Sequence, residues 1–315
     1  MAEPAPPGGS EAVNAVRRLR LEAATANAFD AFDAAGVQGF LLKGAALSAW
    51  LYPEGPKRTF SDSDILVRPA DWAAAQDVLR SISFAPHLDE GAMPAWWEDH
   101  AIGWFRGSDG ALIDLHRSLP GVGVDPEALW NRLSAEADQV AVGGRLVPTL
   151  TVPDRAMHLA LHTAQHGGFR LHEVQRAVEV TDDDTWRAAA AIAQELDATP
   201  AFATGLRMVP EGAALAQRLG LPETAPVDVQ LRAAHAPPVA LGFDQLSRAP
   251  GVRARLSILG HKVFPPPTFM RTWSTLARRS RLGLALAYLW RPIWLVIHAP
   301  AGFRAWSNAR RKTRG

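Results

Sequence analysis

The stretch RTFSDSDILV, residues 58–67, places two aspartates directly before an apolar segment of β type. Side chains alternate between the two faces of a strand, so Asp62 and Asp64 point to the same side and can both reach one cation. Two carboxylates at the edge of a sheet suit Mg²⁺, which keeps coordination positions for substrate phosphates. Asp and Ser are also favoured in turns that precede strands. The pair alone therefore predicts either a metal site or a polar turn.

A third carboxylate, Asp114, lies within the apolar segment ALIDLH, residues 111–116. An uncompensated charge buried in a strand is costly and normally needs a partner or a metal. His116, two residues further on, shares the face of Asp114. The alternative is that this face is solvated, as one side of an antiparallel sheet often is. These residues alone leave both interpretations open.

Hydrophobic periodicity and turn residues around the carboxylates predict a small α/β unit. The turn Lys43-Gly44 joins an apolar strand to a helix-prone segment, and two Gly-containing turns predict hairpins. The expected strands are 39–42, 63–67, 101–105, 111–115, 139–142 and 145–149. The expected helices are 11–35, 45–51 and one that begins near Pro69 with Asp71 as its N-cap.

The remainder of the chain is expected to be helical. Pro153 is well placed in the first turn of a helix, and a loop marked by prolines is expected at 221–240. The predicted organisation is a disordered leader at 1–10, a core at 11–150, a helical region at 151–240 and a basic, Trp-bearing helical tail at 241–315.

The composition excludes several classes of site. The chain has no cysteine, so disulfides, thiolate metal sites and cysteine nucleophiles are ruled out. The first residues, MAEPAPPGGSEAV, lack the basic end and apolar run of a secretory signal peptide. We therefore expect a cytoplasmic protein.

The tail carries a strong positive charge. After residue 250 there are 13 Arg or Lys and no Asp or Glu, whereas the first 250 residues hold 20 basic and 32 acidic residues. Two apolar runs, LGLALAYLW and IWLVIHAP, approach the length of a membrane span, but Arg291 and Pro292 between them argue against a transmembrane span.

Four of the eleven tryptophans follow residue 270. Interleaved with arginines, they leave three interpretations: helices packed on the domain, an interfacial helix that makes the protein peripheral to a membrane, or a nucleic-acid contact. The last dozen residues are expected to be mobile.

Three histidines, His158, His162 and His166, recur at intervals of four and so form one stripe on a helix. The H-E-x-x-H pattern of a zinc site lacks its Glu here. We expect them to be hydrogen-bonded groups on a helix that backs the catalytic unit. His162 and His166, like His116, are candidates for lining a nucleotide or acceptor pocket, and Gly167-Gly168 is expected to end the helix.

The segment LLKGAALSAWLYPEGPKRTFSDSDILVRPADWAAAQDVL, residues 41–79, resembles the uncharacterised bacterial nucleotidyltransferases of the DNA polymerase β superfamily. Members of that family typically show K-G-x-x-L and then R-x-x-x-D-x-D-[IL]-L-V. The later segments ALIDLHRSL, DRAMHLALHTAQHGG and FPPPTFMR with LALAYLWRP also resemble the family, and the resemblance spans roughly residues 12–295.

This resemblance implies an α+β fold: a minimal polymerase-β-like core with a short mixed sheet and flanking helices, followed by a helical C-terminal part. It implies two Mg²⁺ or Mn²⁺ ions, with Asp62 and Asp64 as ligands of both. Asp114 would complete the site and accept the proton of an attacking hydroxyl. The implied reaction moves a nucleoside monophosphate from a triphosphate, ATP foremost, to a small molecule, sugar or peptide-derived acceptor and releases pyrophosphate.

The predicted nucleotide-binding residues are Lys43, Gly44, Arg58 and Ser61. The wider superfamily has Gly-Ser where this chain has Lys43-Gly44, so we expect the amides after Gly44, with Lys43, to bind phosphate. Two alternatives follow. One is a nucleotide-binding regulatory module that has lost turnover, and the other is a nucleotidyltransferase acting on RNA ends or in a toxin–antitoxin pair.

Overall fold

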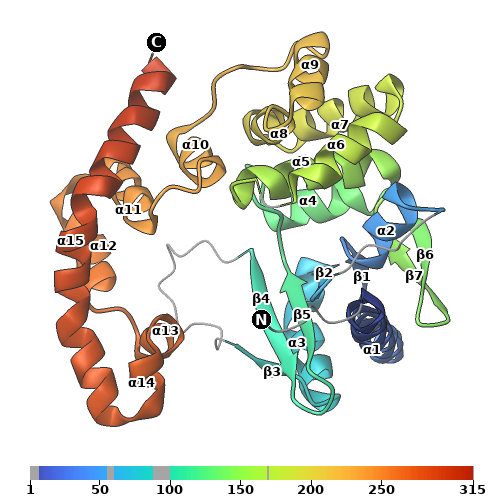
Figure 1. Ribbon diagram of the computed structural model, residues 1–315, viewed down its shortest axis with the longest axis horizontal. Helices are drawn as coiled ribbons and strands as arrows, with labels where there is room; N and C mark the ends of the chain where they lie inside the picture. The colour runs from blue at the N-terminus through green and yellow to red at the C-terminus, as the bar shows by residue number, and fades with distance from the viewer. Residues whose placement is uncertain (1–6, 55–59, 88–99, 169, 315) are drawn as a thin grey trace. The chain divides into compact units, whose positions relative to one another are not determined.

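The computed structural model describes residues 7–54, 60–87, 100–168 and 170–314 (Figure 1). Its contacts divide the chain into two compact units. Unit 1 comprises residues 1–87, 100–158 and 179–197, and unit 2 comprises residues 88–99, 159–178 and 198–315. Residues 151–240, predicted as a helical region, fall partly in unit 1 and partly in unit 2.

Within the described part of the chain, seven strands form one mixed sheet in the order β3-β4-β5-β2-β1-β7-β6. β2 pairs with β5, and β1 with β7, in parallel, while the other neighbours are antiparallel. The strands are β1 (Gly39–Leu41), β2 (Ser63–Val67), β3 (Ala85–Pro86), β4 (Ala101–Arg106), β5 (Ala111–His116), β6 (Asp138–Val142) and β7 (Arg145–Thr149). All six predicted strands and both hairpins are present, so the predicted α+β fold with a mixed sheet is confirmed; the two-residue β3 was not predicted.

One face of the sheet packs on α1 (Pro7–Ala34) and α3 (Trp72–Ser81). Alternate residues of β2 and β5, among them Ile65 and Ile113, are completely buried against this layer. From α1 the layer receives Phe29 and Phe32, whose rings meet edge to face at 6.2 Å between centroids. Because strand side chains alternate, the residues between these apolar positions, including Asp64 and Asp114, point to the opposite face.

Helix starts differ from the predictions at two places. α1 begins at Pro7, so it includes residues 7–10 of the predicted leader, and residues 1–6 lie outside the described part. Asp71 ends a 3₁₀ turn, η1 (Pro69–Asp71), and occupies the N-cap position of α3, but its carboxylate does not cap that helix. It binds the Arg68 guanidinium instead, at 2.7 and 2.9 Å, and accepts the Gln38 amide.

The remaining described helices confirm that the second half of the chain is helical (Figure 1). Two helices not yet described, α2 (Ala45–Leu51) and α4 (Pro126–Leu133), lie in the predicted core at 11–150. The others are α5 (Val152–Gln165), α6 (Leu171–Val180), α7 (Asp183–Glu195), α8 (Thr199–Leu206), α9 (Pro210–Arg218), α10 (Val227–Ala233), α11 (Pro238–Arg248), α12 (Gly251–Val263), α13 (Pro267–Trp273), α14 (Thr275–Arg279) and α15 (Arg281–Arg314). α10 lies inside the predicted loop at 221–240, which is therefore shorter than expected.

The tail differs most from its prediction. α15 continues through Arg291 and Pro292 and reaches Arg314, so residues expected to be mobile are helical. Two side-chain contacts hold the helix just before Pro292, one from Tyr288 in the preceding turn and one from Arg291, the residue before the proline. Tyr288 donates its hydroxyl to the Pro265 carbonyl at 2.6 Å, and Arg291 donates to the Lys262 carbonyl at 2.9 Å. Residues 281–313 are long and apolar enough to cross a membrane by length and composition, and 17% of their most apolar window is buried.

Two glycines in helices offer a matched test of the packing. A Cβ on Gly205 of α8 would lie 1.9 Å from the Ala160 carbonyl oxygen of α5, whereas a Cβ on Gly260 of α12 would meet nothing within 4 Å. We expect Gly205→Ala to lower the free energy of unfolding by about 2–4 kcal/mol through overpacking. Gly260→Ala should raise it by about 0.5–1 kcal/mol because alanine favours helix. Denaturant unfolding of both variants checks this; equal effects would contradict the close α5–α8 contact.

The side chain of Lys262 in α12 provides a test by pH. Burial, with the nearby charge of Arg291, lowers the pKa of Lys262 from 10.5 to about 8. Between these two values the unfolded chain binds more protons than the folded chain, so the free energy of unfolding should rise as pH increases from 8 to 10.5. Lys262→Met should remove this rise and stabilise the protein at pH 7, while exposed Lys312→Met should not. The test is the free energy of unfolding measured from pH 7 to pH 10. If it changed with pH in the same way for wild type and Lys262→Met, the pKa of Lys262 would not be lowered by folding.

Candidate active site

Three predicted site carboxylates lie on the face of the sheet opposite α1 and α3. Asp64 of β2 stands directly beside Asp114 of β5, and Gly103 of β4 stands on the other side of Asp114. Asp62 comes one residue before β2 and is half-buried. We call Asp62, Asp64 and Asp114 the acidic row. The pairing brings together carboxylates separated by about fifty residues in the sequence, as the metal-site interpretation required.

Asp64 is the most constrained member of the acidic row. The residue is 3% exposed, and one carboxylate oxygen lies 2.7 Å from the Lys43 ammonium and 3.1 Å from Nε2 of His116. Burial alone would raise the pKa of Asp64, but the charge of Lys43 and the His116 contact together hold it well below its usual range. Asp64 is therefore an anion at neutral pH, and His116, on the hairpin face that could have been solvated, is buried beside it.

Asp114 has the opposite character. Burial raises its pKa, and the negative charges of Asp64 and Asp62 raise it further. A carboxylate beside two others is poised to take up a proton or to accept a cation. Within one row of the sheet the pKa of Asp64 is thus lowered, whereas the pKa of Asp114 is raised.

The Lys43-Gly44 turn joins β1 to α2 beside Asp64. Gly44 has φ of +64°, a left-handed conformation that costs glycine little. The amide of Leu42 donates to the Asp64 carbonyl at 2.9 Å, which ties the turn to β2. α2 has only seven residues, and the Lys43 ammonium contacts Asp64. Lys43, predicted to bind phosphate, is thus engaged with the acidic row in this structure.

Two histidines lie near the acidic row that the sequence analysis did not assign to the site: His158 was predicted only as a hydrogen-bonded group, and His100 was not predicted at all. His158 of α5 is fully buried, and burial with the charges of Lys43 and His116 holds its pKa well below the usual value. The His100 ring lies 5.6 Å from that of His116. His100 immediately precedes β4, whose first residue, Ala101, pairs with His116. The hairpin register was the signal that could have found it.

A third missed position is Gly103. A Cβ there would lie 3.2 Å from an Asp114 carboxylate oxygen and 3.3 Å from Nδ1 of His87. Glycine at 103 therefore leaves room beside Asp114, and His87 borders the same space. Its isolated occurrence within an apolar strand was the available signal, because strand glycines often mark close approach of another group.

Among the remaining predicted site residues, Ser61 contacts the acidic row through Asp62. Ser61 is exposed, and its hydroxyl lies 3.3 Å from the Asp62 carboxylate. Arg58 lies outside the described residues. His162 and His166 belong to unit 2, and their rings lie next to each other in a tilted arrangement with centroids 4.4 Å apart. Their predicted pocket role stays a prediction.

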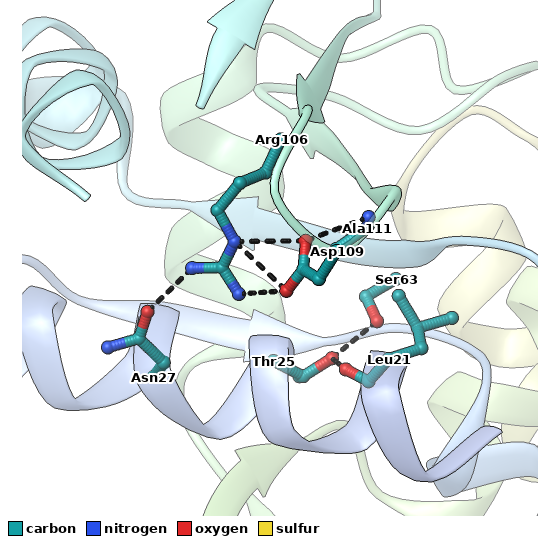
Figure 2. Close-up of polar contacts among 7 residues, drawn as sticks. All are labelled: Leu21, Thr25, Asn27, Ser63, Arg106, Asp109 and Ala111. Atoms are coloured by element: carbon teal, nitrogen blue, oxygen red, sulfur yellow. Dashed lines mark hydrogen bonds and ion pairs between the residues drawn. The ribbon is translucent and has the colours of Figure 1, made fainter. Parts of the chain in front are cut away.

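Polar contacts on the α1 side hold β2 and the β4–β5 hairpin to that helix (Figure 2). Thr25 shares a hydrogen bond of 2.5 Å with Ser63 and donates to the Leu21 carbonyl. Arg106 binds both oxygens of Asp109 and donates to Asn27.

A cavity of about 590 Å³ opens beside these contacts. It is lined by residues of α1, by Ser61 and by the hairpin turn, and its basic lining residues are Arg17 and Arg20. Ser61 therefore borders a hollow surface on one side and Asp62 on the other.

The acidic row fits a divalent cation by its chemistry. Three adjacent carboxylates supply the oxygen ligands that Mg²⁺ prefers, and their mutual repulsion raises the pKa of Asp114. Across the described ranges, no three acidic or histidine ligands converge on one point. The Lys43 ammonium is the cation that Asp64 contacts here.

A mixed sheet that carries Asp64 and Asp114 on paired strands beside a Gly turn is the arrangement expected of a polymerase-β-like nucleotidyltransferase core. Comparison with known families matches residues 9–212 to the family described as an uncharacterised nucleotidyltransferase. The match covers more than half of the chain, so the chain belongs to this family, and the resemblance found in the sequence is confirmed.

Other comparisons are more distant. No curated protein matches significantly. Among solved structures, the lincosamide antibiotic adenylyltransferase LnuA bound to lincomycin is 14% identical, with 49% of this chain and 93% of that chain covered and a TM-score of 0.35. An antigenic nucleotidyltransferase-like protein from Paracoccidioides brasiliensis is 15% identical, with 59% and 92% covered and a TM-score of 0.32. The family match, not these structures, defines the class.

Removing one partner of the buried Lys43–Asp64 pair should be costly. Among the described contacts, Lys43→Met leaves the buried Asp64 carboxylate with His116, and we expect a loss of about 3–5 kcal/mol in the free energy of unfolding without added metal. The matched control is Arg80→Met, which breaks an exposed ion pair with Asp77 and should cost at most about 1 kcal/mol. Chemical denaturation compares them; a Lys43→Met protein as stable as Arg80→Met would show that Asp64 is solvated.

Proposed function

We propose that this protein is a metal-dependent nucleotidyltransferase that moves a nucleoside monophosphate from a triphosphate to an acceptor hydroxyl and releases pyrophosphate. The observation that carries the proposal is the pairing of Asp64 with Asp114, with Asp62 beside them, in a chain that belongs to a nucleotidyltransferase family. ATP is the expected donor, and a small molecule, sugar or peptide-derived compound is the expected acceptor. A cytoplasmic location, where triphosphates are abundant, accords with this reaction.

The acidic row would hold the divalent cations. Bound Mg²⁺ or Mn²⁺ neutralises triphosphate charge and makes the α-phosphorus more electrophilic. Asp64, kept ionised by its surroundings, supplies a permanent anionic ligand. Asp62, half-buried at the start of β2, supplies the second ligand from the same side of the strand.

Asp114 is the proposed general base. Its raised pKa makes it a better proton acceptor than Asp64, so it can take the proton of the acceptor hydroxyl as that oxygen attacks the α-phosphorus. The electron pair of the broken α–β phosphoanhydride bond leaves with pyrophosphate. Lys43, whose ammonium lies beside Asp64, is proposed to contact the phosphates.

A second candidate function is nucleotide binding without turnover. It is favoured by one observation, the Lys43 ammonium that already neutralises Asp64 at 2.7 Å. An internal cation at this position can reduce the affinity of the acidic row for metal. Such a protein would bind nucleotide and report it to a partner.

Incubation with each labelled triphosphate, Mg²⁺ or Mn²⁺ and a cell extract as acceptor source distinguishes the two functions. We expect a labelled product and pyrophosphate with wild type, and no product above background with Asp62→Asn/Asp64→Asn. Asp114→Asn should slow transfer by about 10²–10⁴-fold while retaining nucleotide binding, because it removes a base. Asp77→Asn, an exposed carboxylate of α3, is the matched control and should transfer normally.

Two results would change the assignment. Tight nucleotide binding without pyrophosphate release in any extract would favour the binding module. Transfer that survives in Asp62→Asn/Asp64→Asn would exclude the acidic row as the active site.

A further inference from the structure

The outward face of α15 is apolar over most of its length. Exposed apolar residues recur at alternating steps of four and three, which places them on one stripe of the helix. Leu282, Leu289 and Val296 are each about 70% exposed, at 71%, 70% and 72%. The α15 stripe consists of Leu282, Leu286, Leu289, Ile293, Val296, Pro300 and Phe303, with Trp290 and Ile297 along its edge.

The opposite face of α15 is the one that packs within unit 2. Ala287 belongs to a buried cluster with Met270 of α13 and Ala277 of α14. Arg291 is buried on this face, with its guanidinium over the rings of Phe269 and Trp273 at 4.9 and 4.8 Å. α11 to α14 lie along α15 in Figure 1. Unit 2 therefore packs on one side of the helix and leaves the stripe exposed, except that the Phe303 ring, half-exposed, also meets the Phe243 ring of α11.

The stripe is long and carries no charge. It runs from Leu282 to Phe303, a segment of 22 residues that spans about 33 Å of helix. Exposed arginines flank it, Arg281 before its first residue and Arg304 after its last one. The arginine between them, Arg291, is buried against the neighbouring helices. An uncovered apolar surface of this extent normally marks a binding surface.

The residues around the stripe are positively charged, which favours a negatively charged partner. After residue 250 the chain has 13 basic residues and no acidic ones. Exposed members stand near both ends of the stripe: Arg278, Arg279, Arg281, Arg304, Arg311 and Lys312. We propose that the α15 stripe inserts into the interface of an anionic lipid bilayer, with α15 parallel to the surface and these basic side chains at the headgroups.

Other occupants fit less well. A second copy of the chain would bring the same basic tail, without acidic residues, against the first, and like charges would repel. A nucleic acid needs cationic or aromatic contacts, whereas the centre of the stripe offers leucine, isoleucine and valine. An anionic membrane is complementary to both the apolar and the basic parts.

The packing of Arg291 argues for an in-plane helix over a spanning one. The helix has the length and composition of a span. If it crossed a bilayer, Arg291 would lie near the middle and would have to leave the Lys262 carbonyl and its two aromatic rings. An in-plane α15 keeps every one of these contacts and buries only the stripe.

Vesicle co-sedimentation of the full-length protein tests the proposal, independently of any transferase activity. We expect binding to phosphatidylcholine vesicles with about 30% phosphatidylserine, and at least a tenfold weaker interaction with phosphatidylcholine alone, since each basic residue near an anionic surface adds to the affinity. Leu289→Gln/Ile293→Gln/Val296→Gln should reduce binding at least tenfold. Leu146→Gln, at a leucine 61% exposed on β7 of unit 1, is the matched control and should bind as wild type.

The absence of cysteine allows a second readout. Leu289→Cys labelled with an environment-sensitive fluorophore should shift to shorter wavelength with the anionic vesicles, and a label at Leu146→Cys should not. Arg278→Gln/Arg279→Gln/Arg281→Gln should weaken anionic binding about tenfold or more and leave weak binding to neutral vesicles unchanged.

Several results would overturn the proposal. Equal sedimentation of wild type and the triple stripe variant would show that the stripe does not contact lipid. Equal binding to neutral and anionic vesicles would exclude the charge contribution. A dimer in light scattering that dissociates in the stripe variant would assign the surface to a second copy, and retention in vesicles after alkaline extraction would indicate a spanning helix.

Discussion

The site depends on one buried charge, the Asp64 carboxylate. A strand buried on both sides tolerates an anion only if nearby groups compensate it, and here the compensation comes from two separate segments. Lys43 brings the β1–α2 turn to the carboxylate, and His116 requires that β5 lie beside β2 in its observed register. Placement of the turn, pairing of the parallel strands and position of Asp114 are therefore linked through a single oxygen atom.

The core could be predicted closely because its signals are local. Alternation of apolar residues and Gly-containing turns located the strands to within one or two residues, and side-chain alternation placed Asp62 and Asp64 on one face. The contribution of His100, His158 and Gly103 was missed because it depends on strand register and on a helix packed against the sheet. Neither is encoded in spacing along the chain. Asp71 shows a related limit: its N-cap position was found, but Arg68 three residues earlier competes for its carboxylate.

The tail was harder to interpret, for a different physical reason. In the sequence, the runs LGLALAYLW and IWLVIHAP are apolar at nearly every position, so no polar helix face can be distinguished, and Arg291-Pro292 separates the two runs. The structure shows one helix whose two faces have different surroundings: alanine, glycine and Arg291 face the neighbouring helices, and large aliphatic side chains face outward. Pro292 can be accommodated because contacts from Tyr288 and Arg291 support the helix there. Only the packing shows which apolar residues of α15 are buried against the neighbouring helices and which are exposed.

The scarcity of lysine in this protein has a practical consequence. Only four lysines occur among 33 basic residues, and one of them holds the Asp64 carboxylate. Amine acylation followed by mass spectrometry can therefore report on a single well-resolved position. While Lys43 is engaged by Asp64, its nitrogen is shielded from reagent, and a cation that takes its place would release it. The acylation rate at this one amine thus measures occupancy of the acidic row before any acceptor is known.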